Sequence, residues 1–214
     1  VKAAAGRVPV LAGAIDTTAH RVIDQARRAV ALGAEAIVAT CPFYALNDAE
    51  EIKAHFRAIA AAIDVPVFAY DVPVRLGGAK LGCDLLVELG KEGVLAGVKD
   101  SSGNDVAFRR LVAANEAAGH PLALLTGHEC VVDGMLLLGR RIMADCGSLD
   151  DAKAAQDAGV DILGTTLAGY TGERPKTDGP DLELVDQVAG IAEVPLVVEG
   201  RVHTPAQAAA AMEH

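Results

Sequence analysis

Lys99 is the residue whose type and position in this sequence most favour chemistry. It ends an apolar run, Val94-Leu-Ala-Gly-Val-Lys99, which is typical of a buried strand. Desolvation lowers the pKa of a lysine ammonium, and a neutral lysine amine attacks carbonyl carbons to form a Schiff base. Two other roles stay open: an ion pair with a neighbouring carboxylate such as Asp100, or an amine that reaches out to water.

Other polar residues follow the predicted strands, where a parallel barrel gathers its active site. A phenol beside a Schiff-base lysine relays protons, so Tyr70 is a candidate acid-base group, with an aromatic core or lid residue as the alternative. Arg75 can hold a carboxylate through its planar guanidinium or lie free in solvent. Glu199 is a candidate acid-base group or an acceptor of backbone hydrogen bonds. The remaining candidates at strand ends are Tyr44, Thr126, Asp145, Thr165 and Arg201.

Short β-branched runs alternate with polar turns and helical stretches along the chain. This alternation predicts an α/β fold, a (βα)8 TIM-type barrel of eight parallel strands in one domain over residues 1–214. An open doubly wound sheet is the alternative, but no GxGxxG follows the first strand. The predicted strands are Val8–Ala14, Ala36–Cys41, Val65–Asp71, Val94–Lys99, Leu122–Thr126, Arg141–Asp145, Asp161–Thr165 and Pro195–Glu199.

Helices with an apolar face are predicted between the strands. Asn47-Asp48 and Ser148 are candidate N-caps, and Thr204-Pro205 opens the last helix with proline at its first position. The stretch between the fifth and sixth predicted strands leaves the least room for a helix. The predicted helices include His20–Leu32, Ala49–Ile63, Glu129–Leu138 and Asp150–Ala158, and glycines that can end helices are Gly33, Gly93, Gly139 and Gly159.

Composition excludes several classes of function. The chain has 214 residues with a net charge of −10, and its Lys and Arg residues form no cluster that would bind nucleic acid. No apolar run reaches the roughly 20 residues that span a bilayer, and the N-terminus is too short and mild for a secretory signal. Four cysteines without a CxxC pair predict free thiols in a reducing cytoplasm, and six histidines without ligand spacing predict no metal site.

Residues 1–139 carry four motifs in order: Cys41-Pro-Phe-Tyr44, Ala69-Tyr70-Asp-Val-Pro73-Val-Arg75, Gly97-Val-Lys99-Asp-Ser-Ser-Gly103 and Leu125-Thr-Gly127. Together they resemble the class I aldolase family of N-acetylneuraminate lyase and dihydrodipicolinate synthase. The resemblance implies that Lys99 forms a Schiff base with pyruvate and that Tyr70 relays protons. It also implies that Tyr44 assists the proton relay. In that family the matching tyrosine reaches the site of a neighbouring subunit across the interface of a homo-oligomer.

Residues 140–214 carry a second set of motifs: Met143-Ala-Asp145-Cys, Ile162-Leu-Gly-Thr165-Thr-Leu-Ala-Gly-Tyr170-Thr and Val198-Glu199-Gly-Arg201 with Thr204-Pro205. These resemble the C-terminal part of N-acetylmannosamine-6-phosphate 2-epimerase. The resemblance implies that Glu199 and a lysine exchange the proton at C2 of the sugar. It also implies that Asp145 lies in the sugar pocket, with Arg201 as the cation on the phosphate or sugar side.

Five aldolase-type strands and three epimerase-type strands add up to the eight of a barrel. The sequence therefore predicts that the barrel is a hybrid of two partial barrels joined at Gly139-Arg140. A natural and an engineered origin of this junction both stay open. Strand counting further predicts that Lys99 faces Glu199 across the mouth of the barrel.

The expected activity is a Schiff-base lyase for a 2-oxo sugar acid in the breakdown of sialic acid. Its expected catalytic residues are Lys99, Tyr70 and Glu199, and the other strand-end candidates would bind substrate. No cofactor is expected, because the protonated imine is itself the electron sink. The expected partners are pyruvate, an amino sugar or a sugar phosphate, and a second copy of the chain. Epimerisation of N-acetylmannosamine 6-phosphate and an inactive chimeric scaffold are the two alternatives.

Overall fold

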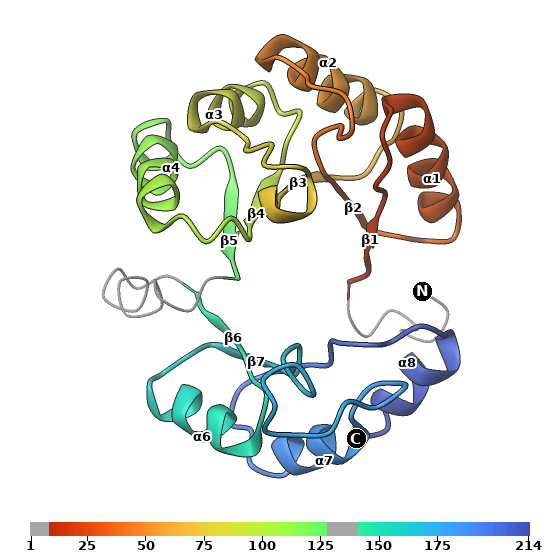
Figure 1. Ribbon diagram of the computed structural model, residues 1–214, viewed down its shortest axis with the longest axis vertical. Coiled ribbons are helices and arrows are strands. Elements are labelled where there is room, and N and C mark those ends of the chain that lie inside the picture. Colours follow the sequence, from red (N-terminus) through yellow and green to blue (C-terminus); the bar gives the residue numbers. More distant parts are fainter. Residues whose placement is uncertain (1–8, 128–140) are drawn as a thin grey trace. The chain divides into compact units, whose positions relative to one another are not determined.

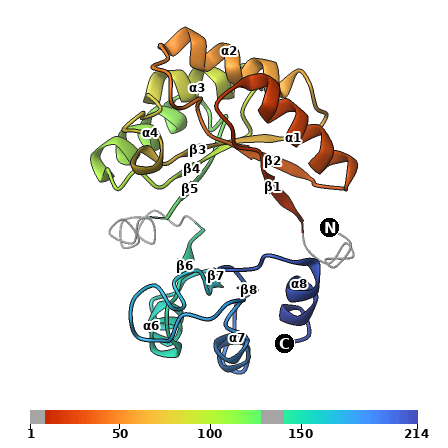
Figure 2. The ribbon, with the colours of Figure 1, turned by 45° about the vertical axis from the view of Figure 1, so that its right-hand side comes forward.

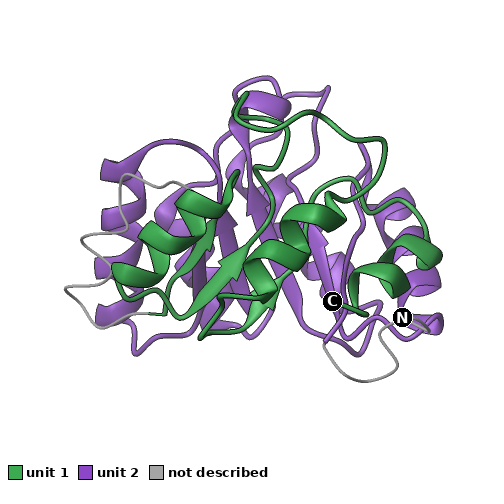
Figure 3. Cartoon of the chain, turned by 90° about the horizontal axis from the view of Figure 1, so that it is seen from below, with its two compact units in different colours: residues 1–7, 129–214 green, residues 8–128 purple. Residues whose placement is uncertain are grey.

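A computed structural model describes residues 9–127 and 141–214 of the chain. The predicted helix Glu129–Leu138 and the predicted junction at Gly139-Arg140 lie outside these described residues. The chain divides into two compact units, one of residues 8–128 and one of residues 1–7 with 129–214, which Figure 3 distinguishes by colour. No helix among the described residues is long and apolar enough to cross a membrane.

The first unit, residues 8–128, is built on a five-stranded sheet in which all neighbouring strands are parallel and follow chain order. Figure 1 shows the α-helices of this unit on one side of the sheet. Sequential order without a reversal is typical of barrels and differs from the doubly wound alternative. The elements are β1 (Leu11–Gly13), α1 (Ala19–Ala31), β2 (Ala36–Ala39), α2 (Ala49–Ala60), β3 (Val67–Asp71), η1 (Pro73–Arg75), α3 (Cys83–Lys91), β4 (Gly97–Asp100), α4 (Asp105–Ala117) and β5 (Ala123–Thr126).

The core of this unit lies between the sheet and its helices. Ala69 and Val98 belong to the same buried apolar cluster as Phe56 and Ile59 of α2. The neighbouring strand positions point to the other face of the sheet, because side chains alternate along a strand. Leu125 on that second face is about half exposed. Alternate residues of each inner strand therefore belong either to the core or to the opposite face of the sheet.

The second unit carries a three-stranded parallel sheet in the order β6-β7-β8. Figure 2 shows the described helices of this unit on one side of the sheet. Leu163 of the central strand packs in a separate apolar cluster with Leu184 and Val188. The elements are β6 (Met143–Asp145), α6 (Leu149–Asp157), β7 (Ile162–Gly164), α7 (Leu182–Ala189), β8 (Leu196–Val197) and α8 (Pro205–Ala211).

The parallel α/β class is confirmed, and the described residues form eight strands in two sheets. The predicted helix starts are also confirmed: Asp48, Ser148 and Thr204 each cap a helix through a reciprocal capping box. The strands are shorter than predicted, and β8 ends at Val197, so Glu199 lies in the segment after the strand. Closure of the two sheets into one barrel stays a prediction.

Candidate functional site

Lys99 and Tyr70 lie side by side at the C-terminal ends of two neighbouring strands. Tyr70 of β3 is the register partner of Lys99 of β4. The Lys99 Nζ atom lies 5.3 Å from the centroid of the Tyr70 ring, and both side chains are half-buried. An ammonium at this distance is attracted by the ring, and a neutral amine there would have a phenol as its neighbour. The structure thus brings together the two residues that the sequence singled out as nucleophile and proton relay.

Alternation along β4 explains how this pair is presented. Val98 and Asp100 are buried, so Lys99 between them points to the opposite face. Gly97 is the next residue on the Lys99 face and pairs with Phe68 of β3. A Cβ atom at Gly97 would lie 2.5 Å from the Phe68 ring, so only glycine leaves space for that ring there. The motif around Lys99 therefore has a packing reason as well as a chemical one.

On the other face of the same two strands, Lys80 joins two buried carboxylates. Its Nζ atom donates to Asp71 Oδ2 and, at 3.3 Å, to Asp100 Oδ2. Asp71 also accepts from the Leu81 N–H at 3.2 Å, and Asp100 accepts from the Ser102 N–H at 2.8 Å. Burial raises the pKa of the Asp71 carboxyl, and the bonds from Lys80 and Leu81 oppose that rise.

This ion-pair cluster bears on the alternative role for Lys99. Asp100 is engaged by Lys80 and Ser102, and Lys99 forms no ion pair with it in the described structure. The structure therefore contradicts the alternative in which Lys99 forms an ion pair with Asp100. Lys80 was absent from the sequence candidates. Its position nine residues after Asp71, beyond η1, gives no periodic pattern that would have revealed it.

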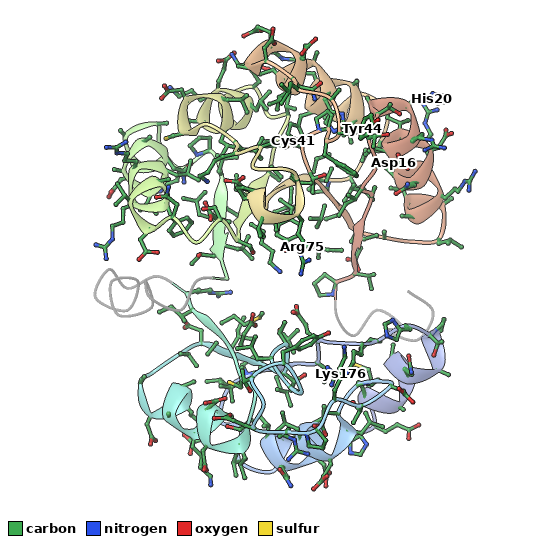
Figure 4. The ribbon with its side chains drawn as sticks, viewed as in Figure 1. Asp16, His20, Cys41, Tyr44, Arg75 and Lys176 are labelled. Carbon is green, nitrogen blue, oxygen red and sulfur yellow. The ribbon has the colours of Figure 1, made fainter. Side chains whose placement is uncertain are left out.

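The substrate-side candidates of this unit lie on three different segments of the chain. Figure 4 places Tyr44 and Arg75 on the connections that follow β2 and β3. Tyr44 is fully exposed with a positive φ of 82°. Arg75 is exposed at the end of η1, and its guanidinium forms no hydrogen bond with the described residues. Thr126 is the register partner of Asp100, so it lies on the face away from Lys99. The structure does not bring Thr126 and Lys99 together.

A second polar cluster lies in the three-stranded unit, around the hydroxyl of Thr166. The Thr166 Oγ1 atom is 2.7 Å from Glu199 Oε2 and 3.0 Å from Asp145 Oδ1. Two of the predicted residues, Glu199 and Asp145, thus approach each other through one threonine. The sequence candidate was Thr165, whereas the structure places the neighbouring Thr166 between the two carboxylates. A carboxylate held this way is in place to accept a proton from a bound molecule.

Thr165 and Arg201 are engaged within the chain. Thr165 is buried, and its hydroxyl donates to the Glu199 carbonyl at 3.0 Å and accepts from the Glu199 N–H at 3.1 Å. The guanidinium of Arg201 donates to the carbonyls of Ala168 and Gly179 and to the Thr177 hydroxyl. Both residues therefore hold the segments around Glu199 in place, and their predicted contact with substrate stays a prediction.

The cysteines agree with the predicted free thiols where they are described. Cys41 and Cys146 are buried and Cys83 is half-buried, all three as free thiols, while Cys130 lies outside the described residues. Burial, with Asp151 and Asp145 nearby, raises the pKa of the Cys146 thiol to about 11. Such thiols are inert. No three metal-ligating side chains gather within the described part of the chain.

Comparison with known families divides the chain in the same way as the motifs. Residues 1–145 match the family described as Dihydrodipicolinate synthetase family. Residues 127–214 match the family described as Putative N-acetylmannosamine-6-phosphate epimerase. The two matches overlap by a short stretch only, so the chain is a chimera of an aldolase-type and an epimerase-type segment.

Individual relatives show the same division. The 4-hydroxy-tetrahydrodipicolinate synthase of Phenylobacterium zucineum is 36% identical over 171 residues, which cover 79% of this chain and 55% of that protein. The Putative N-acetylmannosamine-6-phosphate 2-epimerase of Cutibacterium acnes is 55% identical over 74 residues, which cover 34% of this chain and 32% of that protein. The chain thus spans about a third to a half of the length of these relatives.

A solved structure extends the comparison to the fold. The dihydrodipicolinate synthase of Acinetobacter baumannii, complexed with pyruvate, superposes with a TM-score of 0.57 at 29% identity. The match covers 64% of this chain and 46% of that chain. About two thirds of this chain therefore shares its fold with a part of that dihydrodipicolinate synthase.

Proposed function

Since residues 1–145 make this chain a member of the dihydrodipicolinate synthetase family, we propose that it is a class I aldolase-type lyase whose Lys99 forms a Schiff base with pyruvate or a 2-oxo sugar acid. One observation carries the proposal: the Lys99 amine lies 5.3 Å from the ring of Tyr70, its register partner at the end of the adjacent strand. The amine can add to a carbonyl, and the phenol can relay the protons that imine formation moves.

The reaction follows from these two groups. The Lys99 amine adds to the C2 carbonyl of the 2-oxo acid, and the resulting carbinolamine loses water to give a protonated imine. The C3–C4 bond then breaks, its electron pair moves to C3 to form an enamine, and the C4 hydroxyl gives up its proton to leave an aldehyde. Tyr70 relays protons to and from the carbinolamine and C4 oxygens. Protonation at C3 and hydrolysis of the imine release pyruvate and restore the amine.

The substrate we propose is N-acetylneuraminate, a sialic acid. Its cleavage yields pyruvate and N-acetylmannosamine. The C-terminal segment matches an epimerase named for the 6-phosphate of that same amino sugar. Arg75, exposed and unpaired among the described residues, is a suitable cation for the substrate carboxylate. The proposed partners are small molecules, and a homo-oligomer remains part of the proposal.

Incubation with N-acetylneuraminate tests this function. The chain should release pyruvate, which a coupled lactate dehydrogenase assay measures. The Lys99→Met variant should lose this activity, because methionine keeps the apolar stem and removes the amine. Lys91→Met is the matched control, since Lys91 is an exposed lysine at the end of α3. Equal pyruvate release by Lys99→Met and wild type would refute the proposal.

A second function is favoured by the cluster around Thr166. Glu199 is held 2.7 Å from the Thr166 hydroxyl, which makes it a candidate base for the C2 proton of N-acetylmannosamine 6-phosphate. In this alternative the chain exchanges that proton with deuterium from solvent, and Glu199→Gln abolishes the exchange. Pyruvate release without exchange supports the lyase, and exchange without pyruvate release supports the epimerase. The absence of both activities supports an inactive scaffold.

A further inference from the structure

We propose that Lys80 is a positioning residue for Lys99, because it holds the ends of β3 and β4 together from the face opposite to the reactive pair. The proposal rests on the lyase function given above and assigns a role to a residue outside the family motifs of the sequence. Lys80 does not touch the reacting atoms. It acts through Asp71 and Asp100, the residues that directly follow Tyr70 and Lys99.

Strand register carries the first step of this inference. Tyr70 pairs with Lys99, and the next pair along the same ladder is Asp71 with Asp100. Successive side chains point to opposite faces, so the two carboxylates lie behind the amine and the phenol. Any shift between β3 and β4 that separates the carboxylates also displaces Lys99 from Tyr70. A bond across the rear pair therefore fixes the geometry of the front pair.

Charge and burial carry the second step. The side chains of Asp71 and Asp100 are only 1% and 4% exposed, and one cation, Lys80, contacts both. Two buried carboxylates that share a single ammonium would repel each other without it. Without Lys80, either one of the two carboxylates takes up a proton or the ends of β3 and β4 move apart. If both carboxylates stay ionised, the loss of Lys80 also leaves an additional negative charge directly behind the Lys99 amine, which favours the protonated and unreactive form.

The surroundings of Lys80 show that it is not merely a core residue. Its side chain is 30% exposed and lines a pocket of about 490 Å³ between α3 and α4, together with Cys83, Asn104 and Arg110. A lysine at the wall of such a pocket can be replaced without overpacking the apolar core. The effect of its charge can therefore be separated from the effect of its volume.

Three single variants of the full chain separate positioning from general stability. Lys80→Met removes the charge, and Lys80→Arg keeps it. Lys53→Met is the matched control, because Lys53 on α2 likewise bonds two carboxylates, Glu50 and Glu88, but is not attached to the ends of β3 and β4. Urea unfolding first establishes that each variant is folded.

Two readouts are then measured in parallel. Competitive acetylation with acetic anhydride across a pH series, read by peptide mass spectrometry, gives the reactivity of Lys99 without any substrate. Trapping with pyruvate and borohydride gives the rate of imine formation. In Lys80→Met we expect the acetylation midpoint of Lys99 to move to higher pH and the limiting trapping rate to fall by roughly tenfold or more, since small displacements of reacting groups are costly. Lys80→Arg should recover most of the rate, and Lys53→Met should match wild type.

A folded Lys80→Met chain with the wild-type acetylation profile and trapping rate would overturn the inference. If Lys80→Met does not fold, the triple variant Asp71→Asn, Lys80→Met, Asp100→Asn is measured in its place, because it leaves no unpaired charge in this cluster. A wild-type trapping rate and Lys99 acetylation rate in the triple variant would equally overturn the inference. A wild type that never traps pyruvate refutes the lyase function, and the acetylation profiles then decide the role of Lys80 by themselves.

Discussion

At the scale of single residues, alternate positions of one strand divide packing from chemistry. Val98 and Asp100 face the helices, and Lys99 faces the other way beside Tyr70. The sequence predicted this pair because Lys99 ends an apolar run and because Tyr70 lies one residue before the end of the preceding strand. It did not predict Lys80, whose partners Asp71 and Asp100 are brought to it only by the folding of two strands and an irregular connection.

Replacing Tyr70 by phenylalanine tests the proton relay. The ring beside the Lys99 amine stays in the Tyr70→Phe variant, so the cation–π contact is kept and only the hydroxyl is lost. We expect imine formation with pyruvate to slow by about 10²–10⁴-fold, the usual contribution of a general acid-base group. Tyr170→Phe, in the other unit, is the control. An unchanged trapping rate in Tyr70→Phe would remove the phenol from the mechanism.

His55 should make stability depend on pH. It is buried, its Nε2–H donates to the Thr40 carbonyl at 3.1 Å, and burial lowers its pKa below the ordinary 6.5. The unfolded chain therefore binds a proton before the folded chain does as the pH falls. The stability that neutral His55 supports is complete above pH 6.5 and is lost as the pH falls toward its folded pKa.

Urea unfolding between about pH 7 and pH 5 measures this effect. The His55→Gln variant keeps an N–H donor but cannot take up a proton. We expect wild type to lose more stability than His55→Gln over this range. His20→Gln, at an exposed position on α1, should follow wild type. Parallel pH curves for wild type and His55→Gln would contradict the assignment.

At the scale of elements, local signals predicted where helices begin better than where strands end. Asp48, Ser148 and Thr204 are caps because their side chains accept from backbone N–H groups three residues later, a pattern visible in sequence. Strand ends depend on pairing with a neighbour, which sequence does not show. Glu199 was therefore predicted within a strand, whereas the Thr165 hydroxyl bonds its backbone in the segment after β8.

The capping box of α2 gives a stability prediction. Asp48 Oδ1 accepts from the Glu51 N–H at 2.9 Å, and Glu51 Oε2 accepts from the Asp48 N–H at 2.9 Å. The Asp48→Ala variant should lose about 1 kcal/mol of unfolding free energy, measured in urea. Among the described residues, the side chain of Asn47, the neighbouring candidate, donates to the Ala45 carbonyl and to no other group. The Asn47→Ala variant should therefore lose less. A larger loss at Asn47 would reassign the cap.

At the scale of the whole molecule, the sequence predicted two family segments, and the comparisons confirm them. Motifs and strand order are local properties that survive in a partial chain. Closure of a barrel depends on contacts between distant strands, for which neither motif spacing nor periodicity is a signal. The two apolar clusters, one around Ile37 and one around Leu163, are described separately for each unit.

Cooperativity of unfolding tests the predicted single barrel. Ile37 and Leu163 are both fully buried, one in each cluster. Ile37→Ala and Leu163→Ala should each cost about 2–5 kcal/mol through lost burial and a cavity. If the eight strands close into one barrel, both variants lower the midpoint of the same transition in calorimetry. Two transitions, each shifted by only one of the variants, would show that the units unfold separately.

The central claim is that Lys99 is a Schiff-base nucleophile, and one measurement tests it most directly. The chain is incubated with pyruvate, reduced with borohydride, digested and mapped by tandem mass spectrometry. We predict one reduced pyruvate adduct, on Lys99, that is absent without pyruvate and absent in Lys99→Met, while Lys91→Met labels like wild type. An unlabelled Lys99 in the folded wild-type chain, or an adduct that persists in Lys99→Met, would contradict this account.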